Sequence, residues 1–218
     1  MLASGAVFAH GIHGSDRNFI EASYGFAPAA FMYLGAKHMI TGYDHLLYLA
    51  GVVFFLRNFR DVIKLVSLFA LGHSITLLFG VFAHVQLNAY LIDALIGFSV
   101  VYKAYENLSY LQRNEVEPTK MSASIPFAVF LFGLVHGFGL ATKLQEFNIS
   151  KEGLVANILS FNLGVEIGQL IALAVILVVF NFFRRYSDFD KFSVLVNWLI
   201  MFAGFLLIGY QLSGYYYA

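Results

Sequence analysis

The chain has 218 residues, of which 60% are hydrophobic and 12% charged, with no cysteine and a formal net charge of zero. Soluble domains usually carry about a quarter charged residues, so the composition excludes an ordinary soluble protein and favours a polytopic integral membrane protein. Zero net charge argues against nucleic acid as a partner. The lack of cysteine excludes disulfides, thiolate nucleophiles and thiolate metal sites.

Residues 1–25 are expected to form a polar N-terminal arm, ahead of a single transmembrane helical domain at residues 26–218. The arm contains His10 and His13, which are accessory candidates for metal binding. Its first nine residues are apolar but lack the positively charged start that is typical of a signal peptide.

Apolar runs near the roughly 20 residues that cross a bilayer predict an all-α, polytopic transmembrane helical bundle of about six spanning helices, preceded by a short N-terminal helix. The runs are 27–56, 62–83, 89–111, 125–144, 154–183 and 192–215. The first run is too long for one perpendicular span. It is expected to divide at Thr41–Gly42 into a short helix near the membrane interface and a spanning helix that begins at Tyr43.

Basic residues beside the helix ends predict the orientation, because cytoplasmic loops carry an excess of Lys and Arg. The odd-numbered loops are flanked by Arg57, Arg60, Lys64, Lys103, Arg113, Lys120, Arg184, Arg185 and Lys191. The opposite side has only Arg17, Lys37, Lys143 and Lys151. Both termini are therefore expected outside, on the periplasmic face of a bacterial inner membrane.

Ionisable residues inside or beside the predicted spans are candidates for function, because each costs about 2.5–3.5 kcal/mol at a helix centre. They are His38, Asp44, His45, His73, Asp93, Glu106, His136 and Glu166. In a continuous helix, His38 and His45 would lie about 20° apart on one face. Asp44 could fix the tautomer of an imidazole as a hydrogen-bond acceptor, or bind a metal itself.

A second polar pattern follows the fifth predicted span, where Asn162, Glu166 and Gln169 have i, i+4, i+7 spacing. On the predicted topology Asp44, His45, Asp93 and Glu166 lie in the outer half of the membrane, with His73 and His136 near mid-depth. Glu106 and Asn107 lie at the cytoplasmic end. Imidazole and carboxylate groups without thiolates suit divalent transition-metal ions such as Ni²⁺, Co²⁺ or Zn²⁺.

At these residues the chain resembles the HupE/UreJ family of membrane proteins. The matching segments are His38-Met-Ile-Thr-Gly-Tyr-Asp44-His45, Gly72-His73-Ser74, Tyr105-Glu106-Asn107, Phe132-Gly-Leu-Val-His136-Gly-Phe-Gly139 and Phe161-Asn162-Leu-Gly-Val-Glu166-Ile-Gly-Gln169. The resemblance covers about residues 26–180. It implies divalent-metal transport, with nickel or cobalt as the usual proposal, linked to hydrogenase and urease, and it implies that His38, Asp44 and His45 are needed.

The chain departs from the family's nickel branch at one motif, H-G-x-[AV]-H-G-x-E. Phe132 stands at the position of the first histidine and Gly139 at the position of the final glutamate. Glu166 is the candidate to replace that carboxylate.

The sequence therefore predicts a metal-ion permease or facilitator. The expected metal-binding residues are His38, Asp44, His45, His73, His136 and Glu166, with His10, His13, Asp93, Glu106, Asn107, Asn162 and Gln169 as accessory residues. The ion would be captured at the outer face, pass between the helices and leave past Glu106 and Asn107. Histidine ligands must be neutral, so uptake should fall below about pH 6.5.

The expected partners are the metal ion and the lipid bilayer, with a second copy of the chain or metalloenzyme-maturation proteins as further candidates. Two alternative functions remain open at this point. One is an intramembrane zinc-dependent hydrolase acting on a lipid-like substrate, with Ser74 stabilising the reacting group. The other is a structural or assembly subunit of a membrane complex, in which the polar residues only hold helices together.

Overall fold

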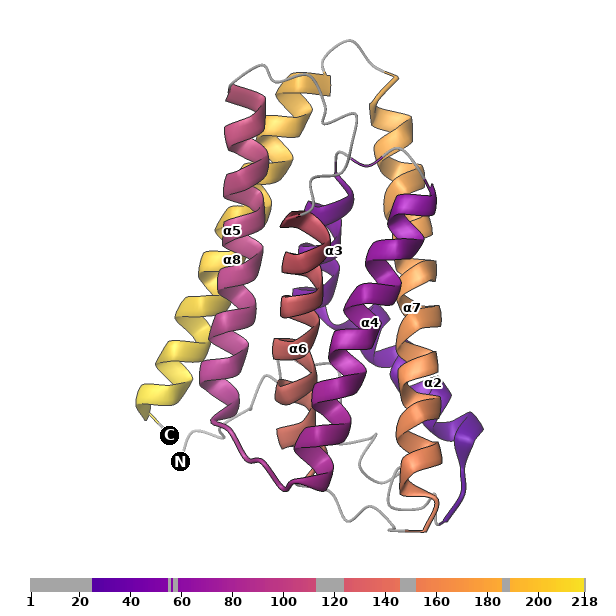
Figure 1. The fold of residues 1–218 in the computed structure, drawn as a ribbon. Coiled ribbons are helices and arrows are strands. Elements are labelled where there is room, and N and C mark those ends of the chain that lie inside the picture. The colour runs from indigo at the N-terminus through magenta and orange to yellow at the C-terminus, as the bar shows by residue number, and fades with distance from the viewer. Residues whose placement is uncertain are drawn as a thin grey trace, which may run out of the picture.

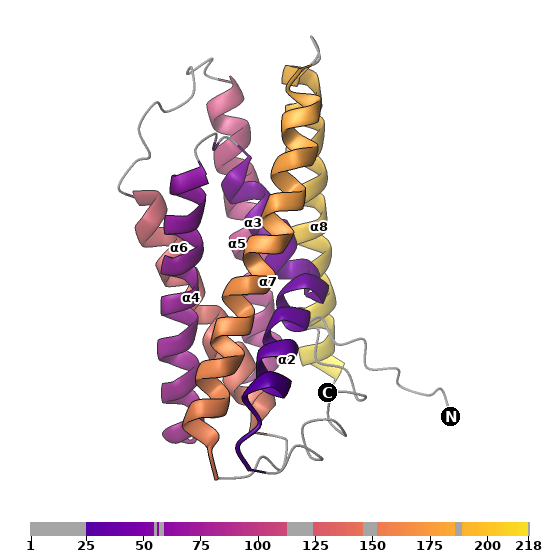
Figure 2. The same ribbon diagram turned by 90° about the vertical axis from the view of Figure 1, so that its right-hand side faces the viewer.

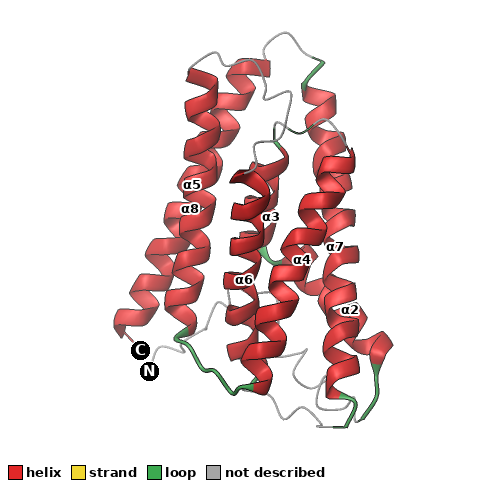
Figure 3. Cartoon of the chain, in the orientation of Figure 1, coloured by secondary structure: helices red, strands yellow, loops and turns green. Residues whose placement is uncertain are grey.

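The computed structural model describes residues 25–54, 56, 59–112, 124–145, 152–185 and 189–217. In these ranges the chain forms seven helices and no strands (Figures 1 and 3). The helices are α2 (Pro28–Thr41), α3 (Tyr43–Val53), α4 (Phe59–Phe82), α5 (Ala89–Gln112), α6 (Ser124–Leu144), α7 (Leu154–Phe183) and α8 (Phe189–Tyr217). The all-α prediction is confirmed for this part of the chain.

The first apolar run divides at Gly42, as predicted. Gly42 has φ −77° and ψ 105°, an extended conformation that ends α2 and starts α3 in a new direction. The hydrogen bonds from Gly42 N to His38 O and from Leu46 N to Gly42 O measure 3.0 and 3.1 Å. They tie the two helices together across the bend.

The prediction that the spanning part of this run begins at Tyr43 needs correction. Helix α3 has only 11 residues, which rise about 16 Å and cannot cross a bilayer alone. The preceding α2 adds 14 residues and packs lengthwise against α7 (Figure 2). The two helices together have the length of one span, broken near its middle.

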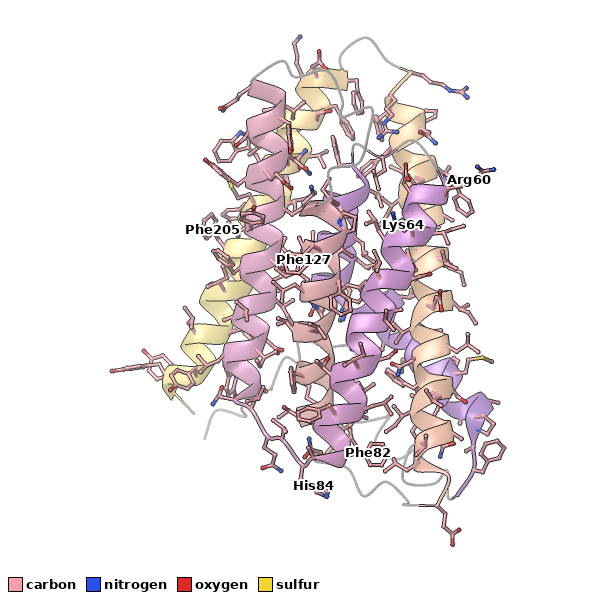
Figure 4. All side chains as sticks on the ribbon, viewed as in Figure 1. Arg60, Lys64, Phe82, His84, Phe127 and Phe205 are labelled. Carbon is pink, nitrogen blue, oxygen red and sulfur yellow. The ribbon has the colours of Figure 1, made fainter. Side chains whose placement is uncertain are left out.

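Among the described residues, four helices are long and apolar enough to cross a membrane: α4, α6 (over Ile125–Leu144), α7 and α8. Helix α5 has 24 residues, a sufficient length, but Asp93, Lys103 and Glu106 lower its apolarity. Large apolar side chains such as Phe127 and Phe205 are exposed on the outside of the bundle (Figure 4). These features show an integral membrane protein, whereas the count of about six spans stays a prediction.

The helices associate most closely as three pairs: α4 with α6, α2 with α7, and α5 with α8. Glycines lie at the contact of each pair, including Gly97 and Gly204 between α5 and α8. A Cβ atom on Gly133 or Gly137 of α6 would collide with the backbone of α4, and Gly164 and Gly168 of α7 face α2 in the same way. Such small-xxx-small spacing lets membrane helices touch backbone to backbone. Polar side chains near these contacts are thereby drawn into the interior.

Candidate metal site

Three buried side chains form the one group of metal-ligating residues found in the described part of the chain. Asp44 and His45 come from the first turn of α3, and His136 comes from α6. One ligand atom from each lies within 4.8 Å of the others. All three residues are at most 3% exposed, so α3 and α6 converge on a small polar site in the interior.

Asp44 orients the imidazole of His45. Its Oδ1 lies 2.8 Å from Nδ1 of His45; when the carboxylate is ionised, as metal binding requires, it can only accept, and Nδ1 then carries the proton. The lone pair is then on Nε2, the atom available to a metal. The positive end of the α3 dipole favours the carboxylate in this first turn. The contact predicted between Asp44 and an imidazole is present.

The imidazole of His136 is oriented by the backbone of its own helix. Nδ1 lies 2.7 Å from the carbonyl oxygen of Phe132, one turn earlier in α6. Since a carbonyl accepts a hydrogen bond, the proton is on Nδ1 and the lone pair is on Nε2. His45 and His136 are therefore held in the same tautomer, the one that suits metal binding through Nε2.

His38, in the last turn of α2, extends this site across the bend. Its ring centroid lies 4.7 Å from that of His45, which in turn lies 4.8 Å from that of His136. Three imidazole rings are thus consecutive neighbours. The continuous helix used to predict that His38 and His45 share a face does not exist, because the helix breaks at Gly42; the break itself brings the two rings together.

Gly42, predicted from the sequence only as part of the break between two helices, is also a residue of the site. A Cβ atom at this position would lie 2.5 Å from Nδ1 of His45 and 3.0 Å from Oδ1 of Asp44. The backbone angles of Gly42 are accessible to other residues, so glycine is required here for space. The sequence marked Gly42 as a break in the apolar run, but it did not predict the contact of Gly42 with Asp44 and His45.

Aromatic side chains line the site. The ring centroid of Phe69 lies 5.0 Å from that of His136 and 6.4 Å from that of His45, and the Tyr48 ring lies 6.3 Å from that of His136. Their burial excludes bulk water from the imidazoles. Phe69 carries no charge and Tyr48 lies in an apolar run, so the sequence did not predict that either residue lines the site.

His73 and Glu166 are placed apart from this group. The Nδ1 of His73 lies 3.2 Å from Oδ1 of Asn162, and its ring stacks on Phe69 with a centroid distance of 6.3 Å. Glu166 is half-buried and accepts a hydrogen bond from the Ser67 hydroxyl at 3.0 Å. The α4–α7 contact therefore holds both residues.

The accessory candidates have varied surroundings. Asp93 accepts a hydrogen bond from Lys143 at 3.0 Å, and Glu106 accepts one from Lys103 at 2.6 Å. Asn107 donates to Gly51 O and to Oδ1 of Asn197, both at 2.8 Å. Gln169 is fully buried, and no hydrogen bond to its amide atoms is found in the described residues. His10 and His13 lie outside the described residues.

Chemically, the Asp44–His45–His136 group offers two imidazoles and one carboxylate in a water-poor interior, with the His38 ring beside them. This donor set is suited to a divalent transition-metal ion. Ser74, considered above as a group for hydrolytic chemistry, donates to Ala70 O at 2.7 Å within its own helix. The arrangement supports binding of an ion and assigns no role to that hydroxyl.

Comparison with known proteins supplies one further finding. The sequence profile described as "HupE / UreJ protein" matches residues 14–218, nearly the whole chain. Searches of curated proteins and of solved structures gave no significant match.

Proposed function

The chain belongs to the HupE/UreJ family, and from this membership and the buried Asp44–His45–His136 group we propose that it is a transition-metal ion permease or facilitator. The cargo is Ni²⁺ or Co²⁺, with Zn²⁺ as the third candidate. The observation that carries the proposal is the convergence of these ligand atoms, from α3 and α6, within 4.8 Å of one another.

Burial in a membrane bundle makes this convergence informative. Ionisable groups are costly at membrane depth and are usually retained for function. Asp44, His45, His136 and the neighbouring His38 are all at most 3% exposed. A divalent ion would satisfy the carboxylate and several imidazoles together, and a helix-packing role does not require that arrangement.

The broken helix gives the site a feature that transporters use. Many secondary transporters bind their cargo where a helix is interrupted near the membrane midplane. Here the last turn of α2 brings its carbonyl ends toward the break, and these partial negative charges favour a cation. The first turn of α3 brings Asp44. Both helix ends at Gly42 therefore contribute to cation binding.

The proposed orientation places both termini outside, in the periplasm of a bacterial inner membrane. Arg60 and Lys64 lie near one end of α4, and Phe82 and His84 mark the other end (Figure 4). The C-terminal end of α7, which Arg184 and Arg185 follow, lies at the same end of the bundle as the N-terminal end of α4 (Figure 1). This basic end would face the cytoplasm.

The hydrolase alternative has less support. The cavity that lies beside the site, between Tyr48 and Phe132, has a volume of about 50 Å³, whereas sites for small organic ligands usually exceed about 300 Å³. An acyl chain does not fit in that space. A purely structural role is supported for Asn107 and Asn197, which bond to each other, but it leaves the imidazole group unexplained.

The test is metal binding and metal flux by the purified full-length protein. Elemental mass spectrometry after incubation with Ni²⁺ or Co²⁺ should find about one ion per chain for the wild type and much less for His45→Ala. His84→Ala is the matched control, since His84 is exposed at a helix end and should bind as the wild type does.

Metal flux into proteoliposomes that contain a metal-sensitive dye should be similar for the wild type and His84→Ala, and much lower for His45→Ala. A wild-type protein that binds none of the three ions would overturn the proposal. Binding without flux, together with hydrolysis of a lipid amide, would favour the zinc enzyme.

A further inference from the structure

A small cavity lies directly beside the metal site, on the side of α3 and α6 that faces α5. Its volume is about 50 Å³, and Tyr48, Phe132, Tyr102, Lys103 and Glu106 are among the residues that line it. Since a water needs about 10–15 Å³ by a comparable measure, the cavity has room for a partly hydrated ion. The cavity is therefore lined by both charged and aromatic side chains.

The cavity and the metal site share a wall. The rings of Tyr48 and Phe132 are 4.9 Å apart, and the Tyr48 ring is 6.3 Å from that of His136. The carbonyl of Phe132 also accepts the hydrogen bond that orients His136. An ion that moved from the metal site into the cavity would therefore have to pass the Tyr48 and Phe132 side chains.

Inside the cavity the carboxylate of Glu106 already holds a cation, the ammonium group of Lys103. The two side chains are 2.6 Å apart and only 24% and 10% exposed. The stem of Lys103 lies against Gly51 of α3, where a Cβ atom would be 3.1 Å from its Cγ. The ammonium group is carried by a stem with four rotatable bonds, so its displacement from the carboxylate would require no movement of the backbone.

A second cavity, of about 220 Å³, continues from Glu106 along α5. It shares Tyr102 and Glu106 with the first cavity and extends past Ser109 to Tyr110. Tyr102 and Tyr105, which also line it, are exposed, so it reaches the surface. Glu106 therefore lies between a cavity beside the metal site and one that opens at the surface, in the half of α5 toward its C-terminal end.

We propose that Glu106 is an inner binding station for the divalent cation and that Lys103 is its tethered competitor. The inference rests on the proposed transport function. An ion leaving the histidine site passes Tyr48 and Phe132 and displaces the Lys103 ammonium from Glu106. When the ammonium returns, it expels the ion toward the surface cavity. The lysine thereby keeps the inner station from holding the ion tightly.

Equilibrium binding of Co²⁺ to the full-length protein in detergent tests this assignment directly. The wild type should bind one ion per chain. Lys103→Met removes the competing charge and should raise the stoichiometry to two, and the double variant Lys103→Met/Glu106→Gln should return it to one. The double variant leaves no unpaired charge in the cavity, so it also controls for misfolding of a single variant.

Flux of Co²⁺ into dye-loaded proteoliposomes gives the second readout. Glu106→Gln should transport at least ten-fold more slowly while its affinity at the histidine site stays within two-fold of the wild type. Asp190→Asn, an exposed carboxylate in the first turn of α8, is the matched control and should leave flux unchanged. One ion per chain in Lys103→Met, or normal flux in Glu106→Gln, would overturn the inner station. Failure of the wild type to bind Co²⁺ at all would instead remove the proposed function and the inference with it.

Discussion

At the scale of single residues, the site depends on which nitrogen of each imidazole carries a proton. Asp44 fixes this for His45 and the carbonyl of Phe132 fixes it for His136. The same partners also hold the rings in place, which lowers the cost of ordering them when an ion binds. His73 is oriented as well, by Asn162, but it lies outside the converging group.

This difference predicts unequal effects for two histidines on neighbouring helices. His136→Ala should weaken Co²⁺ binding at least 100-fold, because it removes a direct ligand. His73→Ala should weaken it by no more than about ten-fold, the lower end of the range for outer-shell partners. Isothermal titration or cobalt absorption spectroscopy measures both affinities. Equal losses would mean that His73 binds the ion directly.

At the scale of helices, the bend at Gly42 creates the site. It joins His38, at the end of α2, to Asp44 and His45, at the start of α3, and it directs both helix ends toward the same point. The α4–α6 pair supplies the third histidine, and its close packing at Gly133 and Gly137 fixes the position of His136 relative to α4.

Replacing Gly42 with alanine should disrupt binding without unfolding the protein. The added methyl group would lie 2.5 Å from Nδ1 of His45 and force the Asp44–His45 pair apart, whereas the backbone angles suit alanine. We expect at least a ten-fold loss of Co²⁺ affinity and an unchanged circular dichroism spectrum.

The matched control for this substitution is Gly209→Ala in α8, where a Cβ atom would have no neighbour within 4 Å. It should keep full affinity and gain slightly in helix stability. If Gly42→Ala bound cobalt as tightly as Gly209→Ala, the tight fit of Asp44 and His45 around residue 42 would be refuted.

At the scale of the whole molecule, large apolar side chains cover the outside of the bundle, and a smaller set of polar groups lies within its mainly apolar interior. Helices α4, α6, α7 and α8 have the length and apolarity for a bilayer. Basic residues gather at one end and both proposed ion stations lie in the interior. This distribution gives the molecule a direction across the membrane that can be measured.

Because the chain contains no cysteine, a single introduced cysteine is the only thiol in the protein that a maleimide can label. Its accessibility from one side of the membrane therefore shows the orientation. Arg60→Cys and His84→Cys place the label at opposite ends of α4 (Figure 4). In intact cells a membrane-impermeant maleimide should label His84→Cys and leave Arg60→Cys unlabelled until the membrane is permeabilised. The reverse pattern would show that both termini are cytoplasmic.

Much of the architecture could be read from local sequence. The apolar composition determined a helical membrane protein, because lipid cannot satisfy exposed backbone groups. The division at Thr41–Gly42 followed from run length and a glycine. The Asp44–His45 contact could be predicted because the two residues are adjacent in the chain. Each of these inferences needs only neighbours along the chain.

Tertiary structure decided which distant groups join the site. Periodicity shows which residues share a face of one helix, but it does not show which helix that face will meet. Close packing of glycines placed α6 against α4 and α7 against α2, so His136 reached Asp44 and His45 while Glu166 was turned toward Ser67. The cavity between this site and Glu106 likewise exists only because α3, α5 and α6 meet there. The sequence by itself determined the chemical groups available for metal binding, and the packing of the helices decided which of them share a site.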